Sequence, residues 1–180
     1  MLHLIFIVFV MLLLSFVFLS SNIFTKVVSS SSSSSSLSNF TFVERIPQEG
    51  TSEIQVLQPE GIDIDSQGSI YVNDIEPNHV SKFSKNGTYI LSWGSTGSGD
   101  GQFNHPHGNE VDQDGVYITD QGNARVQKFT RDGKFITKWG SEGEWDGLFS
   151  KPESIDVDSF GHVYVADTSN NNVQVFVPNN

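Results

Sequence analysis

The chain has 180 residues and a formal net charge of −11, with twenty-one Asp and Glu against ten Lys and Arg. Such an acidic surface repels phosphate backbones, so nucleic acid is not an expected partner. The chain has no cysteine, which excludes disulfides and thiolate zinc sites. Abundant glycine and phenylalanine suit short strands joined by tight turns.

The N-terminal segment is apolar. Residues 2–19 carry no Lys, Arg, Asp or Glu, and the first such residue is Lys26. A run of this length can nearly span the core of a bilayer. We therefore expect a hydrophobic helix in residues 1–25, either an uncleaved membrane anchor or a cleaved signal peptide. Residues 26–38 are rich in serine and should form a flexible linker. Residues 39–180 would then be membrane-anchored outside the cytoplasm, or secreted.

The remainder of the chain repeats itself. Residues 59–74, 106–120 and 152–167 each begin at a proline and end at an aspartate. The prolines are 47 and 46 residues apart, and the aspartates 46 and 47. Each period predicts four short antiparallel strands joined by turns, which is one blade of a β-propeller. The predicted fold class is all-β.

The first period shows the signals. Ile62 and Ile64 alternate with acids, which is the period-two pattern of a half-exposed strand. The dipeptide Asn86-Gly87 is a strong hairpin signal, and Asp132-Gly133 matches it in the second period. The closing aspartates of the three periods recur too regularly for a catalytic set. We expect each of them to cap a turn in its own blade.

Two segments identify the kind of blade. Residues 120–129 (DQGNARVQKF) and 167–176 (DTSNNNVQVF) resemble the core pattern of the NHL-repeat family, and residues 74–83 are a looser copy. The resemblance covers about residues 40–178 and implies propellers of the six-bladed type. It does not indicate an activity, because propeller blades are reused for many functions.

The repeats predict about three blades. The orphan residues 40–46 have a period-two pattern and are expected to supply the fourth strand of the last blade. The expected blades are 59–105, 106–151, and 152–180 together with 40–46. Because propellers close with four to eight blades, three would leave two faces bare. A homodimer forming a six-bladed ring, a fragment of a longer propeller, and assembly with other propeller pieces all remain open.

Acidic residues repeat on the expected innermost strands. Asp63, Glu110 and Asp156 occupy equivalent positions and could form a ring of carboxylates that binds calcium or magnesium. The alternative is that these side chains bind neighbouring backbone or are solvated.

A second equivalent set is Glu60, His107 and Glu153, with His105 nearby. A group of this kind could hold zinc with an open position for a substrate. Since some propeller relatives are metal enzymes, the resemblance implies a metal-dependent hydrolase or lyase as an alternative function. The simpler interpretation is that the histidines are solvated loop residues.

We expect a binding scaffold rather than an enzyme, with a protein, peptide or glycan as ligand. Trp145 has no counterpart in the preceding loop and is a candidate contact residue, together with His105 and His107. Asn39 and Asn86 fit the glycosylation sequon. Family resemblance also suggests a role in the ubiquitin pathway, which the absence of cysteine for a zinc-binding RING domain disfavours.

Overall fold

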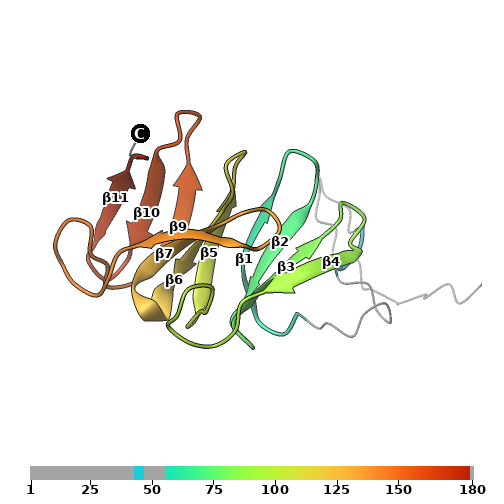
Figure 1. Cartoon of the computed structure of the whole chain (residues 1–180), viewed down its shortest axis with the longest axis horizontal. Coiled ribbons are helices and arrows are strands. Elements are labelled where there is room, and N and C mark those ends of the chain that lie inside the picture. Colours follow the sequence, from blue (N-terminus) through green and yellow to red (C-terminus); the bar gives the residue numbers. More distant parts are fainter. Residues whose placement is uncertain (1–42, 47–55, 179–180) are drawn as a thin grey trace, which may run out of the picture. The chain divides into compact units, whose positions relative to one another are not determined.

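The computed structural model describes residues 43–46 and 56–178, and its regular structure is almost entirely β (Figure 1). The strands are β1 (Pro59–Ile64), β2 (Ile70–Asp74), β3 (His79–Phe83), β4 (Tyr89–Trp93), β5 (Pro106–Val111), β6 (Val116–Asp120), β7 (Arg125–Phe129), β8 (Phe135–Trp139), β9 (Pro152–Val157), β10 (Val163–Asp167) and β11 (Asn172–Phe176). One short 3-10 helix, η1 (Gln121–Asn123), follows β6. The N-terminal helix and the serine linker expected from the sequence lie outside the described residues. Within the described residues no helix is long and apolar enough to cross a membrane.

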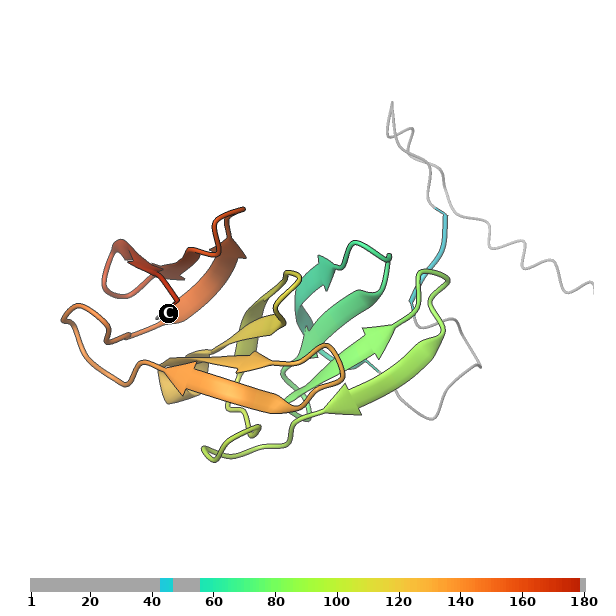
Figure 2. The same ribbon diagram turned by 45° about the horizontal axis from the view of Figure 1, so that its top comes forward.

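The strands form three antiparallel sheets, and each sheet is one blade (Figure 2). Blade 1 is β1-β2-β3-β4 and blade 2 is β5-β6-β7-β8, each in chain order. Blade 3 is β9-β10-β11, with three strands in the described part of the chain. The predicted all-β fold and its repeating unit are confirmed.

The turns form as their sequences predict. The backbone N–H groups of Gln67 and Ser69 both donate to one carboxylate oxygen of Asp65, which closes the turn from β1 to β2. Asp112 and Asp158 close the same turn in the other blades. This local bonding explains why a short polar sequence is sufficient to specify each hairpin.

The aspartates that end the second strands act over a longer range than expected. The Asp74 carboxylate accepts from the backbone N–H groups of Leu57, 2.6 Å away, and Gln58, 2.8 Å away. Asp167 does the same for Ser150 and Lys151. These aspartates therefore fasten the loop that enters the innermost strand of their own blade. The structural role is confirmed, since Asp74 also accepts from the Glu76 backbone N–H at 3.2 Å in the turn after its strand. The additional capped segment lies about sixteen residues upstream.

The hydrophobic core lies between the blades. Tyr71 and Val80 of blade 1 pack with Val116, Ile118 and Phe129 of blade 2. An equivalent cluster joins blades 2 and 3. The innermost strands also pass close to one another, because a Cβ on Gly61 would lie 2.2 Å from the His107 carbonyl oxygen, and one on Gly108 would lie 2.4 Å from that of Glu153. Glycine at these two positions lets neighbouring blades meet.

Residues 43–46 do not pair with blade 3, contrary to the expectation for residues 40–46. They form no regular strand, and the Ile46 side chain packs on blade 1 against Ile70, Val72 and Phe83. The apolar side chains of blade 1 facing away from blade 2 provide the contact surface, which a period-two pattern alone could not reveal. Residues 40–42 lie outside the described residues.

Candidate functional site

Asp63, Glu110 and Asp156 occupy equivalent positions on the innermost strands β1, β5 and β9. Burial, followed by the charges of Asp63 and Asp156, raises the pKa of Glu110 to about 7. Asp63 also accepts a hydrogen bond of 2.7 Å from the backbone N–H of Val111 on the next blade. Glu110 therefore lies near both aspartates. Asp63 binds backbone of the neighbouring blade, the alternative considered for these side chains, and so links blades 1 and 2.

Glu60, His107 and Glu153 lie one after another on β1, β5 and β9. The Nε2 atom of His107 is 3.6 Å from a carboxylate oxygen of Glu60. Glu153 is engaged elsewhere, since it pairs with Lys151 at 2.6 Å and accepts from the Thr168 hydroxyl at 2.7 Å. The hydrogen bond from Lys151, followed by that from Thr168, lowers the pKa of Glu153.

His105 lies beside this row. Its ring centroid is 6.1 Å from that of His107, and its backbone N–H donates to the Asn78 side chain at 2.7 Å. In residues 43–46 and 56–178 no three His, Asp or Glu side chains are grouped so that they could hold a metal ion. Calcium or zinc binding by either row therefore stays a prediction.

Trp145 lies in the loop between β8 and β9, with 78% of its surface exposed. The loop is held by its own backbone, since Leu148 N–H donates to Trp145 O and Gly143 N–H donates to Phe149 O, both at 2.9 Å. Glu144 and Asp146, on either side of the indole, are also exposed. The loop is fixed and presents an exposed aromatic ring whose neighbours in the sequence are both acidic.

Two glutamine side chains clamp these loops, which the sequence analysis did not identify. Gln127 of β7 accepts from Gly101 N–H at 3.0 Å and donates to Gln102 O at 2.7 Å. Gln174 of β11 makes the same pair of bonds to Gly147 and Leu148. The Val-Gln pair repeated in β7 and β11 was the available signal.

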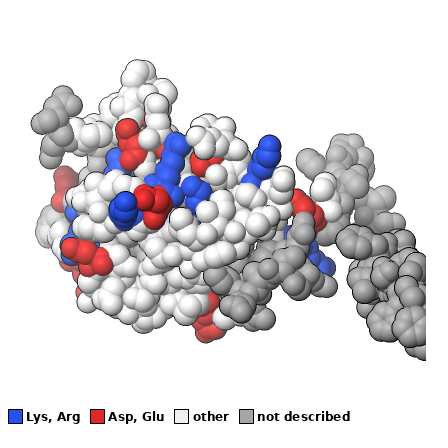
Figure 3. Space-filling model, turned by 45° about the vertical axis from the view of Figure 1, so that its right-hand side comes forward, with Lys and Arg blue, Asp and Glu red and all other residues white. Residues whose placement is uncertain are grey.

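The positive residues of blade 2 are engaged with their neighbours. Lys128 lies over the Tyr117 ring, 4.7 Å from its centroid, and Arg131 donates to the Asp112 carbonyl. Lys138 pairs with Asp100 at 2.6 Å. Figure 3 shows Lys and Arg side chains interspersed with Asp and Glu on the face it displays.

Of the two sequons, Asn86 lies at the exposed tip of the β3–β4 hairpin. Its neighbour Gly87 has φ of +74°, which glycine adopts readily. Asn39 lies outside the described residues. Glycosylation at both positions stays a prediction.

Comparison with known proteins identifies the repeat. Residues 149–176 match the NHL repeat. This NHL match covers the β9–β11 blade and confirms the family resemblance there. No curated protein matches the sequence.

Solved structures match over a longer stretch. A catalytically inactive virginiamycin B lyase from Staphylococcus aureus, with quinupristin, superposes at a TM-score of 0.51 and 15% identity, covering 72% of this chain and 45% of its own. A protein from Bacteroides fragilis described as exported superposes at 0.51 and 16% identity, covering 68% of this chain and 32% of its own. The chain therefore spans less than half the length of these structures. At such identities the likeness shows the fold alone.

Proposed function

We propose that this chain is an exported or membrane-tethered array of NHL-type blades that binds its ligand through the loop carrying Trp145. The observation that carries the proposal is the exposed indole between Glu144 and Asp146. A large aromatic ring on a fixed loop supplies binding area at low entropic cost. Export is supported by the apolar N-terminal sequence and by the similarity to an exported protein.

The matching loop of blade 1 provides an internal comparison. Gly97 N–H donates to Phe103 O at 2.9 Å, as Gly143 N–H does to Phe149 O. In this equally fixed loop, Gly99 stands at the position of Trp145. Because the loop forms without an indole, Trp145 is not required for the fold.

The surroundings of the indole indicate the class of ligand. An exposed ring with acidic residues next to it in the sequence suits a cationic group, which can gain both cation–π attraction and charge-assisted hydrogen bonds. We propose a protein or peptide segment with an exposed Lys or Arg side chain. A glycan, which also fits aromatic surfaces, is the alternative outcome.

The test is titration of the detergent-solubilised full chain with a capped tri-arginine peptide, followed by calorimetry. Trp145→Ala should weaken binding at least tenfold, while Trp145→Phe should retain most of it. Asp146→Asn should weaken binding more than Asp114→Asn, which removes the same charge from an exposed hairpin elsewhere. Equal effects of the two Asn variants would show only general attraction to an acidic protein, and would overturn the proposed site.

The second candidate is a metal-dependent hydrolase or lyase. It would act at the two sets of equivalent residues on the innermost strands, Asp63, Glu110 and Asp156 and Glu60, His107 and Glu153. It is supported by the charges of Asp63 and Asp156 near Glu110, because a cation would relieve their repulsion of the Glu110 carboxylate. Calcium should then raise the melting temperature of the wild-type chain and raise that of Glu110→Gln less. No response to calcium or zinc would remove this candidate.

A further inference from the structure

The two ends of the blade array have bare apolar faces. On blade 3, Val173 is 61% exposed, whereas Val80 and Val126 at the same repeat position are fully buried. Tyr164 is likewise exposed, although the equivalent Tyr117 is buried against the next blade. This face of blade 3 is the one by which blades 1 and 2 each contact their successor.

Blade 1 is bare on the opposite face. Ile62 is 67% exposed, while the equivalent Ile155 is only 8% exposed. Ile64 is exposed as well, whereas the equivalent Val111 is buried in the contact between blades 1 and 2. The two bare faces are therefore the two halves of the contact that joins successive blades within the chain.

Ile46 takes the place of a residue from a preceding blade. It lies 13 residues before Pro59, just as Trp93 lies 13 residues before Pro106. Ile46 and Val56 pack on Ile70, Val72 and Phe83. Trp93 and Phe103 pack in the same way on the equivalent residues of blade 2, which are Val116, Ile118 and Phe129. Residues 43–46 thus stand where the fourth strand of a preceding blade would end.

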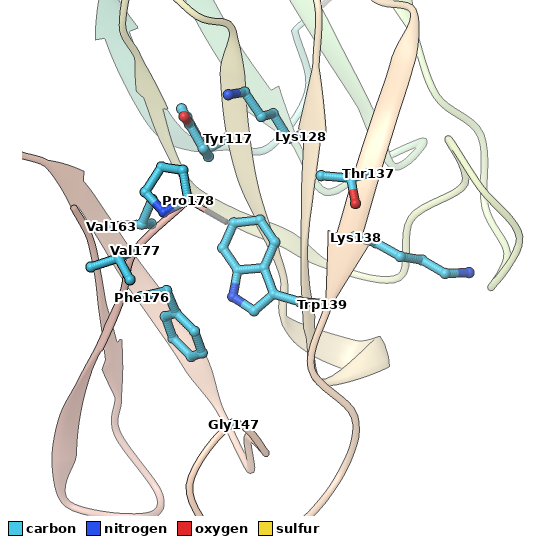
Figure 4. Close-up of a pocket in the computed structure, with 10 residues that line it drawn as sticks. All are labelled: Tyr117, Lys128, Thr137, Lys138, Trp139, Gly147, Val163, Phe176, Val177 and Pro178. Atoms are coloured by element: carbon cyan, nitrogen blue, oxygen red, sulfur yellow. The ribbon is translucent and has the colours of Figure 1, made fainter. Parts of the chain in front are cut away.

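A groove of about 610 Å³ marks the matching gap on blade 3. Trp139 and Phe176 face each other in it, beneath Tyr117 and Lys128 (Figure 4). Between blades 1 and 2 the corresponding space is filled by the fourth strand of blade 2, where Phe135 packs on Phe129 at a centroid distance of 5.9 Å.

We propose that two copies of this chain join head to tail into a six-bladed ring, each copy supplying residues 43–46 as part of the fourth strand of the other copy's blade 3. Tyr164 and Val173 of one copy then complete the cluster around Ile46 of the other. A second copy is the occupant because it carries both a strand segment in the required register and the complementary apolar face. The strand closes the last blade in trans rather than within one chain.

The internal registers define the pairing. In blade 2, Lys128 is opposite Thr137, and in blade 1 Lys82 is opposite Leu91. The equivalent pair across the two copies is Val175 with Glu44. Two residues paired in this way have Cα atoms about 4.5–5.5 Å apart, a separation that a disulfide can bridge.

Near the innermost strands, the proposed contact between two copies differs from the contacts between blades of one copy. Ser154 carries a Cβ where Gly61 and Gly108 have none, so β1 of the second copy cannot approach β9 as closely. Ala166 stands where Thr119 donates to the Glu153 carbonyl at 2.8 Å, so this link between blades is missing. The contact between copies therefore depends on the outer strands and should be weaker than the internal contacts.

The absence of native cysteine allows a direct test in the full chain in detergent. Glu44→Cys and Val175→Cys are prepared as separate proteins, mixed, and oxidised with copper–phenanthroline. The mixture should yield a covalent pair on a non-reducing gel. Either protein alone should not, because the two copies of position 44 in a ring would lie at different contacts between the chains, and so would the two copies of position 175. Glu44→Cys mixed with Lys128→Cys is the matched control, since β7 already pairs with β8.

Native mass spectrometry completes the test. The wild-type chain should have twice the mass of one copy. Tyr164→Asp with Val173→Asp should reduce it to one copy, while Ile90→Asp, an exposed position on β4, should leave it unchanged. A wild-type mass of one copy, a mass above two copies, or no covalent product in the mixture would each overturn the proposal. The cross-link reads out association even if the double variant fails to fold.

Discussion

The Nε atom of Arg125 lies 2.7 Å from a carboxylate oxygen of Asp120, and both side chains are buried. The same guanidinium donates to the carbonyl oxygens of Ser98 and Gly99 in the loop before β5. One ion pair therefore ties the end of β6 to the loop that enters its blade. Blade 1 has His79 at this position and blade 3 has Asn172, so the cationic partner is particular to blade 2.

Asp120→Asn should be the most costly of the substitutions at the three closing aspartates. It leaves the buried Arg125 charge without its partner, an effect of about 3–5 kcal/mol. Asp74→Asn loses charge-assisted hydrogen bonds to the backbone but leaves no buried cation without a partner. Its loss of unfolding free energy should therefore be smaller. Urea unfolding of the solubilised chain, followed by tryptophan fluorescence, measures both. A smaller loss at Asp120 than at Asp74 would contradict the assigned role of the ion pair.

Glu110 should make stability fall as pH rises. Its pKa in the folded chain is about 7, above the ordinary value of about 4.3, so the folded state holds a proton that the unfolded state releases. The contribution is therefore complete below pH 4 and is lost as pH rises to 7. The loss is about 1–2 kcal/mol once solvent screening is allowed for.

Glu110→Gln should accordingly raise the melting temperature at pH 8 and change it little at pH 4. Melting curves of both proteins at the two pH values provide the measurement. An equal gain at both values would point to a packing effect in place of titration.

Two glycine substitutions should separate collision from backbone strain. Gly108→Ala places a methyl group against the Glu153 carbonyl and should cost towards the upper end of about 1–3 kcal/mol. Gly147 has φ of +81° with open space around it, so Gly147→Ala should cost only the left-handed strain of about 1–2 kcal/mol. The two unfolding free energies should rank in this order, and the reverse ranking would refute the close approach of β5 to β9.

Gln174→Ala should loosen the loop that carries Trp145 without unfolding the blade. The variant loses both hydrogen bonds from β11 to Gly147 and Leu148. Amide hydrogen exchange over residues 143–149 should speed up at least tenfold, while exchange in β9 stays slow. Gln127→Ala should act in the same way on residues 97–103 and leave 143–149 unchanged, which makes each variant the control for the other.

The sequence by itself determined the blades, their strands and their hairpins. These features depend on local chemistry, such as Asn86-Gly87 at a turn and the alternation of apolar and polar residues along β1. The repeat shows equivalent signals in successive blades. The sequence also placed Asp63, Glu110 and Asp156 at equivalent positions of the repeat, while the metal binding suggested for them stays a prediction.

Only the tertiary structure decided which surfaces meet. Period-two alternation gives a strand two faces but does not say which neighbour covers each, so Ile46 was expected on blade 3 and lies on blade 1. The hydrogen bonds from Gln127 to Gln102 and from Arg125 to Gly99 each join a strand to a loop more than twenty positions away. The distances across such contacts are set by the packing of whole blades, and no local pattern encodes them.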